Sequence, residues 1–258
     1  VNDENKLVAK AGSGDCPCKQ FTLEVVSFGA ERVAELAQRA DHVIVCAGNQ
    51  PLINAREEYD RPDIRLPKAQ TALLNAAAAA NESTLLYLVT GYPFAINKEK
   101  DTAKAVLCST HLGPCLGHVA AATVFGENNP AGRTPTTWYR SVRDLPALDD
   151  YDIAKNHVTY LYFRGNPLYA FGYGLSYTTF AYSNLTVKQE NGEVIATVNV
   201  QNTGALDGDE VVQLYMSLPG SLRVRPIHAL KAFKRVHIKA GETVTIKVEG
   251  EDEDAAAE

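Results

Sequence analysis

The feature that most constrains this sequence is a set of short, almost wholly apolar runs that end in glycine. Residues 41–48 read DHVIVCAG and residues 83–91 read STLLYLVTG, and a shorter run, KAVLCSTHLG, follows at 104–113. Strands that are buried on both faces show continuous apolar runs of this kind, whereas half-exposed strands alternate. The runs therefore predict neighbouring strands of a buried, mostly parallel sheet.

Segments with helical spacing separate these runs. They are residues 27–40, the alanine-rich stretch 66–80 with Pro67 at its first turn, and residues 117–127, which close at Gly126. Alternating strands and helices predict an α/β fold, here a three-layer α/β sandwich. Ligands of such sheets bind beyond the carboxyl ends of the strands.

The residue composition and the hydrophobic pattern change in the second half of the chain. Residues 148–179 are rich in Tyr and Gly, and we expect an ordered connector there. Residues 180–258 alternate apolar and polar side chains, with turns at Asn191-Gly192 and Ala240-Gly241. We expect an α/β domain over residues 1–147 and an all-β immunoglobulin-like sandwich over 180–258. Five or six strands are visible there, and since such sandwiches need about seven, we expect this one to be truncated.

Charge, hydropathy and cysteines narrow the range of functions. The net charge is −6 and no basic cluster exceeds two or three residues, which argues against nucleic acid and anionic membranes as partners. Apolar runs are too short to span a bilayer, and the polar opening does not resemble a signal peptide. The five cysteines form no metal-binding pattern. We therefore expect no metal, buried free thiols and a cytoplasmic protein; a secreted or periplasmic one is the alternative.

Five ordered stretches resemble glycoside hydrolase family 3, the β-glucosidases and β-xylosidases. Residues 41–74 resemble the core of that family's second domain, and FGENNPAGRTPTTWY at 125–139 resembles its Phe-Gly-x-x-Asn-Pro-x-Gly-Arg signature. Residues 167–185 resemble the segment that leads to a fibronectin type III-like domain, and residues 200–216 and 230–248 resemble that domain. The resemblance therefore extends over most of the chain.

The resemblance also implies what this chain does not contain. Enzymes of the family carry a (β/α)8 barrel that supplies the nucleophilic aspartate and most sugar-binding residues, and no such barrel is visible in these 258 residues. The chain would be the non-barrel part of an exo-acting retaining β-glycosidase acting on a β-linked oligosaccharide or glycoside. It would need a barrel domain or a barrel chain as its partner, and no cofactor. The sequence leaves open whether the protein forms a homo-oligomer.

An acidic stretch, NAREEYDRPDIRLP at residues 54–67, follows the first apolar run. In the family the general acid/base is usually a Glu three residues before the Asp of an Asp-Arg pair, which implies Glu57 here, with Glu58 as second choice. Asp60 and Arg61 would form an orienting pair, because a guanidinium can brace a carboxylate and the loop backbone. Without the resemblance, all these charges could equally be solvated or favour the dipole of the next helix.

Two further residues at predicted strand ends are candidates for sugar contact. Asn49 follows the first strand, where its amide could bind substrate or cap a loop, and His111 follows the third, where partial burial with a hydrogen bond is the alternative. Trp138 fits a seam between domains better than a sugar platform. A second hypothesis for the whole chain is a non-catalytic carbohydrate-binding or assembly module.

Overall fold

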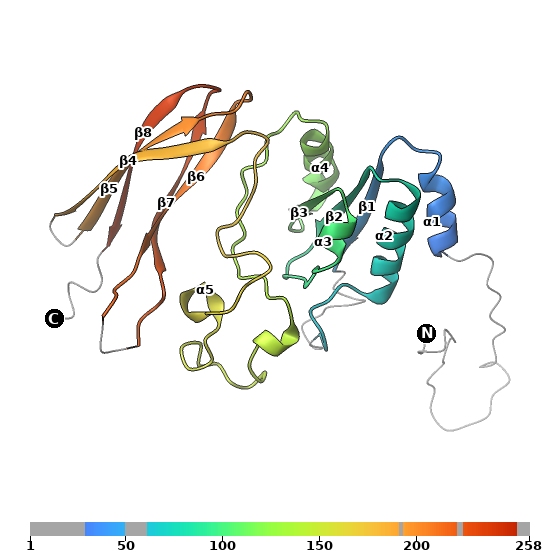
Figure 1. Ribbon diagram of the computed structural model, residues 1–258, viewed down its shortest axis with the longest axis horizontal. Helices are drawn as coiled ribbons and strands as arrows, with labels where there is room; N and C mark the ends of the chain where they lie inside the picture. Colours follow the sequence, from blue (N-terminus) through green and yellow to red (C-terminus); the bar gives the residue numbers. More distant parts are fainter. Residues whose placement is uncertain (1–28, 50–60, 191–192, 221–223, 252–258) are drawn as a thin grey trace.

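The computed structural model describes residues 29–49, 61–190, 193–220 and 224–251 (Figure 1). The first half contains three helices of two or more turns and three strands, in the order α1 (Gly29–Ala37), β1 (Val43–Gly48), α2 (Lys68–Ala80), β2 (Thr84–Val89), β3 (Ala105–Ser109) and α4 (Leu116–Val124). The short helix α3 (Glu99–Thr102) precedes β3. The predicted alternation of strands and helices is confirmed.

The three strands form a parallel sheet in the order β1-β2-β3. Helices α1 and α2 lie together on one side of the strands, and α4 lies on the other side (Figure 1). The α/β class and the parallel sheet predicted from the sequence are confirmed. Because all three strands run the same way, their carboxyl ends meet at a single edge of the sheet.

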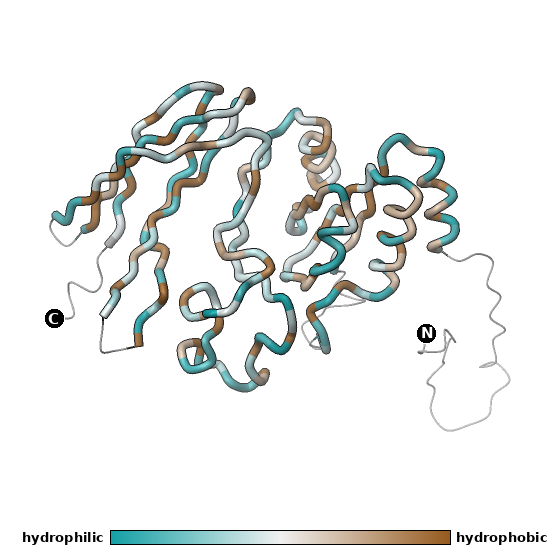
Figure 2. The backbone as a smooth tube through the Cα atoms, in the orientation of Figure 1, coloured by the Kyte–Doolittle hydropathy of each residue, from teal (hydrophilic) through white to brown (hydrophobic). Residues whose placement is uncertain are grey.

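The core of this domain lies between the sheet and α2. Leu74 of α2 packs with Leu86 and Leu88 of β2, and all three are fully buried. Val45 and Ala47 of β1 join the same cluster, as alternation along a strand requires. Figure 2 shows the corresponding hydrophobic stretches along the strands and along α2 and α4. No helix within the described ranges is both long and apolar enough to cross a membrane.

The prediction of buried thiols is wrong for the three cysteines that the structure describes. Cys46, Cys108 and Cys115 are free and exposed. Cys46 points to the face of the sheet opposite α2, because it alternates with Val45 and Ala47. A continuous apolar run predicts burial on both faces of a strand, whereas the face of β1 that carries Cys46 is exposed here. Cys16 and Cys18 lie outside the described residues.

The second half is a β-sandwich. One antiparallel sheet has the order β4 (Phe180–Glu190), β5 (Glu193–Asn202), β8 (Thr243–Glu251), and the other pairs β6 (Gly208–Met216) with β7 (Ala229–Ile238). Apolar side chains from β5, β6, β7 and β8 close its core. The described strands number five, within the predicted five or six. Gly241, with φ of 77°, lies in the turn between β7 and β8, which belong to different sheets.

A connector rich in aromatic residues joins the two domains. Trp138 is buried, packs edge-on against Tyr169 and forms an antiparallel bridge with it. On the sandwich side, Tyr160 stacks on Phe171 and contacts Tyr215 of β6. Aromatic rings therefore fix the connector, as predicted, on the sandwich side through Tyr160. Trp138, expected in the seam between domains, packs in the α/β core against the connector.

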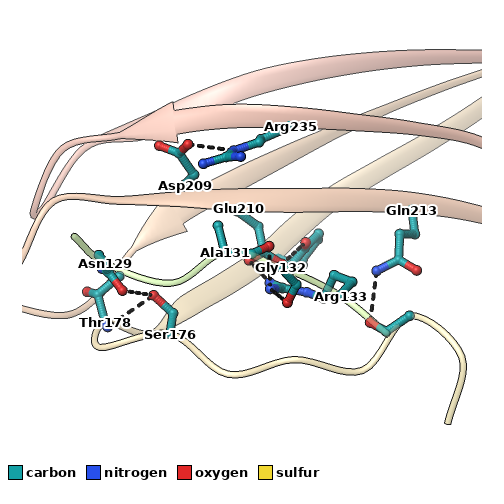
Figure 3. A network of polar contacts seen from close by, with 12 residues as sticks. Asn129, Ala131, Gly132, Arg133, Ser176, Thr178, Asp209, Glu210, Gln213 and Arg235 are labelled. Atoms are coloured by element: carbon teal, nitrogen blue, oxygen red, sulfur yellow. Dashed lines mark hydrogen bonds and ion pairs between the residues drawn. The ribbon is translucent and has the colours of Figure 1, made fainter. Parts of the chain in front are cut away.

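Polar contacts lock the same junction (Figure 3). Arg133 forms an ion pair with Glu210 of β6 at 2.7 Å, and both side chains are nearly buried. Asn129 donates to the carbonyl of Asp207 and accepts from Ser176. Asn129 and Arg133, both in the FGENNPAGR stretch, therefore pack the α/β domain against the sandwich.

Candidate functional site

The carboxyl edge of the parallel sheet is where the sequence placed the site. The backbone of Asn49, the residue after β1, donates to the carbonyl of Val89 at the end of β2, at 3.2 Å. The Asn49 side-chain oxygen accepts from the backbone nitrogen of Gly91 at 2.9 Å, and the residue is only 7% exposed. The loop-capping role of Asn49 is therefore confirmed, and its contact with substrate stays a prediction.

Gly48 explains why β1 ends in glycine. Its φ of 140° is in a range that side chains rarely adopt, and a Cβ there would lie 1.9 Å from the carbonyl oxygen of Val89. Gln70, in the first turn of α2, holds this residue with two hydrogen bonds. Its side-chain oxygen accepts from the Gly48 nitrogen and its amide nitrogen donates to the Gly48 carbonyl, both at 3.0 Å. The chain therefore enters residues 50–60 from a fixed point.

Arg61 fixes the other end of the same segment. Its guanidinium lies 5.0 Å from the ring centres of both Tyr92 and Phe94, and both terminal nitrogens donate to the carbonyl of Pro93 at 3.4 Å. Burial lowers the pKa of Arg61 from its usual value. Cation–π contacts of this kind gain strength when the cation is desolvated. The loop that follows β2 thus anchors Arg61.

Glu57 and Asp60 lie outside the described residues, so their predicted roles stay predictions. What the structure does describe is the frame around them: Gly48 and Asn49 before the segment, and Arg61 after it, are both tied to the end of β2. The predicted brace of Arg61 on Asp60 also stays a prediction, because the described partners of Arg61 are the loop residues 92–94.

His111 lies two residues beyond β3, at the same edge of the sheet, and is exposed. It forms no hydrogen bond with the residues described here, so the alternative of a partly buried, hydrogen-bonded histidine is wrong. Among the described strands, β3 lies at the edge of the sheet. Contact between His111 and a sugar stays a prediction.

Sequence reasoning missed two residues that shape this edge. Gln70 was hidden in an alanine-rich helix, although a polar side chain in the first turn of an otherwise apolar helix is a recognisable signal. Tyr92 follows the glycine at the end of the second apolar run and is 41% exposed. The contact of Gln70 with Gly48 and that of Tyr92 with Arg61 depend on the tertiary structure and could not be predicted from the sequence. Within the described residues there is no group of three or more His, Cys, Asp or Glu side chains that could hold a metal ion.

Comparison with known families agrees with this architecture. Residues 6–177 match the Glycosyl hydrolase family 3 C-terminal domain. This chain belongs to glycosyl hydrolase family 3. Residues 210–257 match the Fibronectin type III-like domain, so the β-sandwich of this family 3 chain is a domain of that type.

Curated relatives carry several glycosidase names. The chain is 35% identical over 230 residues to the periplasmic beta-glucosidase of Salmonella typhimurium, covering 84% of this chain and 30% of that protein. It is 33% identical to the xylan 1,4-beta-xylosidase of Xylanibacter ruminicola, covering 83% of this chain and 26% of the relative. This family 3 chain therefore spans about 30% of the length of such relatives.

Solved structures share the fold. The beta-glucosidase DesR from Streptomyces venezuelae superposes with a TM-score of 0.77 at 29% identity, covering 86% of this chain and 30% of that one. The beta-glucosidase from Kluyveromyces marxianus gives a TM-score of 0.78 at 30% identity, over 86% of this chain and 28% of its own. This chain therefore shares the fold of the matching part of two solved beta-glucosidases.

Proposed function

We propose that this chain is the non-barrel part of an exo-acting retaining β-glycosidase and that it supplies the general acid/base, Glu57. The observation that carries the proposal is the fixed frame around the acidic segment in a chain of family 3. Gln70 and Asn49 hold its start, and Arg61 holds its end, at the carboxyl edge of a parallel sheet. A catalytic loop needs such anchors, because a displacement of about 1 Å costs about a hundredfold in rate.

The chemistry requires two carboxyl groups about 5–5.5 Å apart. One attacks the anomeric carbon, and the other protonates the leaving oxygen and then removes a proton from water. Glu57 fits the second role, and Asp60 with Arg61 would orient the segment. The nucleophilic aspartate would come from a (β/α)8 barrel domain or chain, so this chain alone should not turn over substrate.

The substrate class is a terminal β-linked sugar. The names of the relatives include beta-glucosidase and beta-xylosidase, so the terminal sugar that is removed is a glucose-like or xylose-like pyranose. His111, exposed at the same edge of the sheet, is a candidate for contact with its hydroxyls. The barrel would contribute the remaining contacts.

The test is a chimera in which this chain replaces the matching 230 residues of the Salmonella typhimurium enzyme. Hydrolysis of p-nitrophenyl β-glucoside and β-xyloside is compared for the chimera, for the isolated chain and for two matched variants. Glu57→Gln should lower kcat by at least about a hundredfold, and the neighbouring Glu58→Gln should not. Turnover by the isolated chain that Glu57→Gln abolishes would refute the need for a barrel.

The leaving group gives a second readout. A p-nitrophenolate leaves without protonation, whereas an alkoxide does not, so Glu57→Gln should lower kcat/KM for cellobiose far more than kcat/KM for the aryl glycosides. Equal losses of kcat/KM on the two substrates would contradict the acid/base assignment of Glu57 while leaving the enzyme assignment intact.

The alternative function is a non-catalytic carbohydrate-binding or assembly module. Exposed aromatic side chains such as Tyr92 and Tyr173 favour it. Binding of cello-oligosaccharides and xylo-oligosaccharides by the isolated chain, unaffected by Glu57→Gln and without any active chimera, would support the module.

For location we propose the cytoplasm, because the exposed free thiols Cys46, Cys108 and Cys115 fit a reducing compartment. The name of the Salmonella typhimurium relative, a periplasmic enzyme, favours the alternative. Cell fractionation with an antibody against this chain distinguishes the two. Recovery in the periplasmic or secreted fraction would overturn the cytoplasmic proposal.

A further inference from the structure

A cleft lies between the connector and the sandwich. Its volume is about 390 Å³, and it is lined by His157 and Arg164 of the connector and by residues 217–220 and 224–227, which lie between β6 and β7. The short helix α5 (Thr159–Tyr162) lies beside the ends of these two strands (Figure 1). Pockets for small ligands measure about 300–1,000 Å³, so the cleft has the size of a ligand site.

Hydrogen bonds tie the two walls of the cleft together. The backbone nitrogen of Ile227 donates to the carbonyl of Leu161 in α5 at 2.7 Å, and the Ser217 hydroxyl donates to the carbonyl of Ile227 at 2.7 Å. Tyr160 of α5 also contacts the ring of Tyr215, near the end of β6. These contacts fix the distance between the walls, so the cleft belongs to the folded structure.

The connector wall contains strained backbone. His157 and Thr159 have φ angles of 52° and 61°, and a β-branched residue such as Thr is an outlier in this left-handed region. Val158 between them is buried, and the Thr159 nitrogen donates to the Tyr139 hydroxyl at 2.7 Å, which holds the turn in place. Strained residues persist where the surrounding structure holds them, and they cluster at ligand sites and active sites.

The charged groups of the cleft are basic. Arg164 is exposed, Arg225 is partly buried, and His157 lines the cleft with them. No carboxylate lines it in the part of the chain that the structure describes. Asp150, on the same connector, forms an ion pair with Lys155. Guanidinium groups bind carboxylates and phosphates through charge-assisted hydrogen bonds, often two in parallel, so the lining favours an anionic group.

Much of the remaining lining is apolar. Leu218, Val224 and Ile227 are all exposed, and Pro219 and Pro226 belong to the same wall. Ligand sites of this kind combine an apolar surface with a few polar groups that orient the ligand. A pyranose ring offers C–H groups to an apolar wall, and a uronic acid adds one carboxylate to that ring. An inorganic anion would gain nothing from the apolar side chains.

We propose that this cleft is a binding site for an acidic sugar, a uronic acid residue of a saccharide. Arg164 and Arg225 bind its carboxylate, and Val224 and Ile227 contact the apolar face of its ring. A saccharide is the ligand class that fits a chain of glycosyl hydrolase family 3. The proposal makes no use of Glu57, so it and the proposed function can fail separately.

The test is a titration of the 258-residue chain, followed by NMR of isotope-labelled methyl groups. The two probes differ only in the exocyclic group of the ring: methyl β-D-glucuronide carries a carboxylate, and methyl β-D-glucoside carries a hydroxymethyl group. We expect the glucuronide to bind at least about tenfold more tightly and to shift the methyl signals of Leu218, Val224 and Ile227, because hydrogen bonds to a charged group are the stronger ones. Equal affinities, no saturable binding, or shifts confined to other methyl groups would overturn the proposal.

Matched variants assign the charge. Arg164→Gln removes an exposed guanidinium and should reduce the preference for the glucuronide to below about threefold, whereas Arg164→Lys should keep part of it. Arg235→Gln removes the same charge from β7, where the side chain is 62% exposed, and should change neither affinity. Equal losses of glucuronide binding in Arg164→Gln and Arg235→Gln would show that only net charge matters, and would overturn the site.

A further variant and a further probe separate a sugar from an inorganic anion. Val224→Ser trims an exposed side chain of the apolar wall, so both sugars should bind about threefold more weakly, with phosphate binding unchanged. Inorganic phosphate is the second probe. Tighter binding of phosphate than of the glucuronide, at the same methyl groups, would identify an anion site without a sugar and would overturn the proposal.

Discussion

Replacing Arg133 by Met should lower the free energy of unfolding and let the two domains unfold in separate transitions. The Arg133 and Glu210 side chains are 13% and 12% exposed, and they form an ion pair at 2.7 Å across the junction (Figure 3). Breaking a buried pair by removing one partner costs about 3–5 kcal/mol, because the remaining charge is left buried. Tyr182 still donates to the Glu210 carboxylate, so we expect the lower end, about 3 kcal/mol.

The double variant Arg133→Met/Glu210→Met removes both charges. Replacing a buried pair by apolar side chains is often neutral or stabilising, so the double variant should lie within about 1 kcal/mol of the parent. The difference between the single and double variants is the coupling energy of a double-mutant cycle. A matched control is Arg235→Met, since the Arg235–Asp209 pair is more exposed, at 62% and 24%, and should cost at most about 1 kcal/mol.

The assay is urea unfolding followed by two probes. The single tryptophan, Trp138, reports on the connector and the α/β core, and far-ultraviolet circular dichroism reports on both domains. In the parent the two transitions should coincide, and in Arg133→Met they should separate. A loss below about 1 kcal/mol in Arg133→Met, with no coupling in the cycle, would refute the reasoning that this pair is effectively buried.

Three further predictions concern single positions. Gly48→Ala should lower the free energy of unfolding by about 3 kcal/mol or more, because the new methyl meets the carbonyl of Val89; a change below 1 kcal/mol by urea titration would contradict the register. Asn202→Ala should cost about 3 kcal/mol, since this fully buried amide serves several backbone and side-chain partners of the sandwich, and an unchanged thermal midpoint would be the contrary result. A hydrogen bond from His237 lowers the pKa of Asp209. The ionised Asp209 carboxylate therefore stabilises the fold above the ordinary aspartate pKa, and this contribution is lost as the pH falls through the pKa of the folded state. The melting temperature of Asp209→Asn should fall less than that of the parent between about pH 5 and pH 2, and parallel curves would disprove the contribution.

Much of the local structure was readable from the chain. Continuous apolar runs predicted β1, β2 and β3, because doubly buried strands show no alternation. Pro67 marked the start of α2, since proline suits the first turn of a helix. The aromatic connector was recognised because rings bury large areas with few rotatable bonds.

The polar contacts that hold the ends of the acidic segment could be predicted from the sequence only in part. Arg61 was expected to brace Asp60, which lies outside the described residues, and its contacts with the rings of Tyr92 and Phe94 and the carbonyl of Pro93 were not foreseen. Those residues are some thirty positions away along the chain, and the strand order brings them together. Gln70 was missed for the same reason, because its partner Gly48 is defined by the packing of α2 on β1.

The sequence by itself determined the α/β and all-β halves, the positions of most strands, and the acidic segment in which Glu57 is proposed to act. These follow from local periodicity and from motifs that need no partner to be read. Only the tertiary structure decided that Asn49 caps a loop, that His111 and the described thiols are exposed, and that one face of β1 is bare. Exposure and long-range hydrogen bonds depend on which surfaces meet, and hydrophobic periodicity does not specify which partner covers a face.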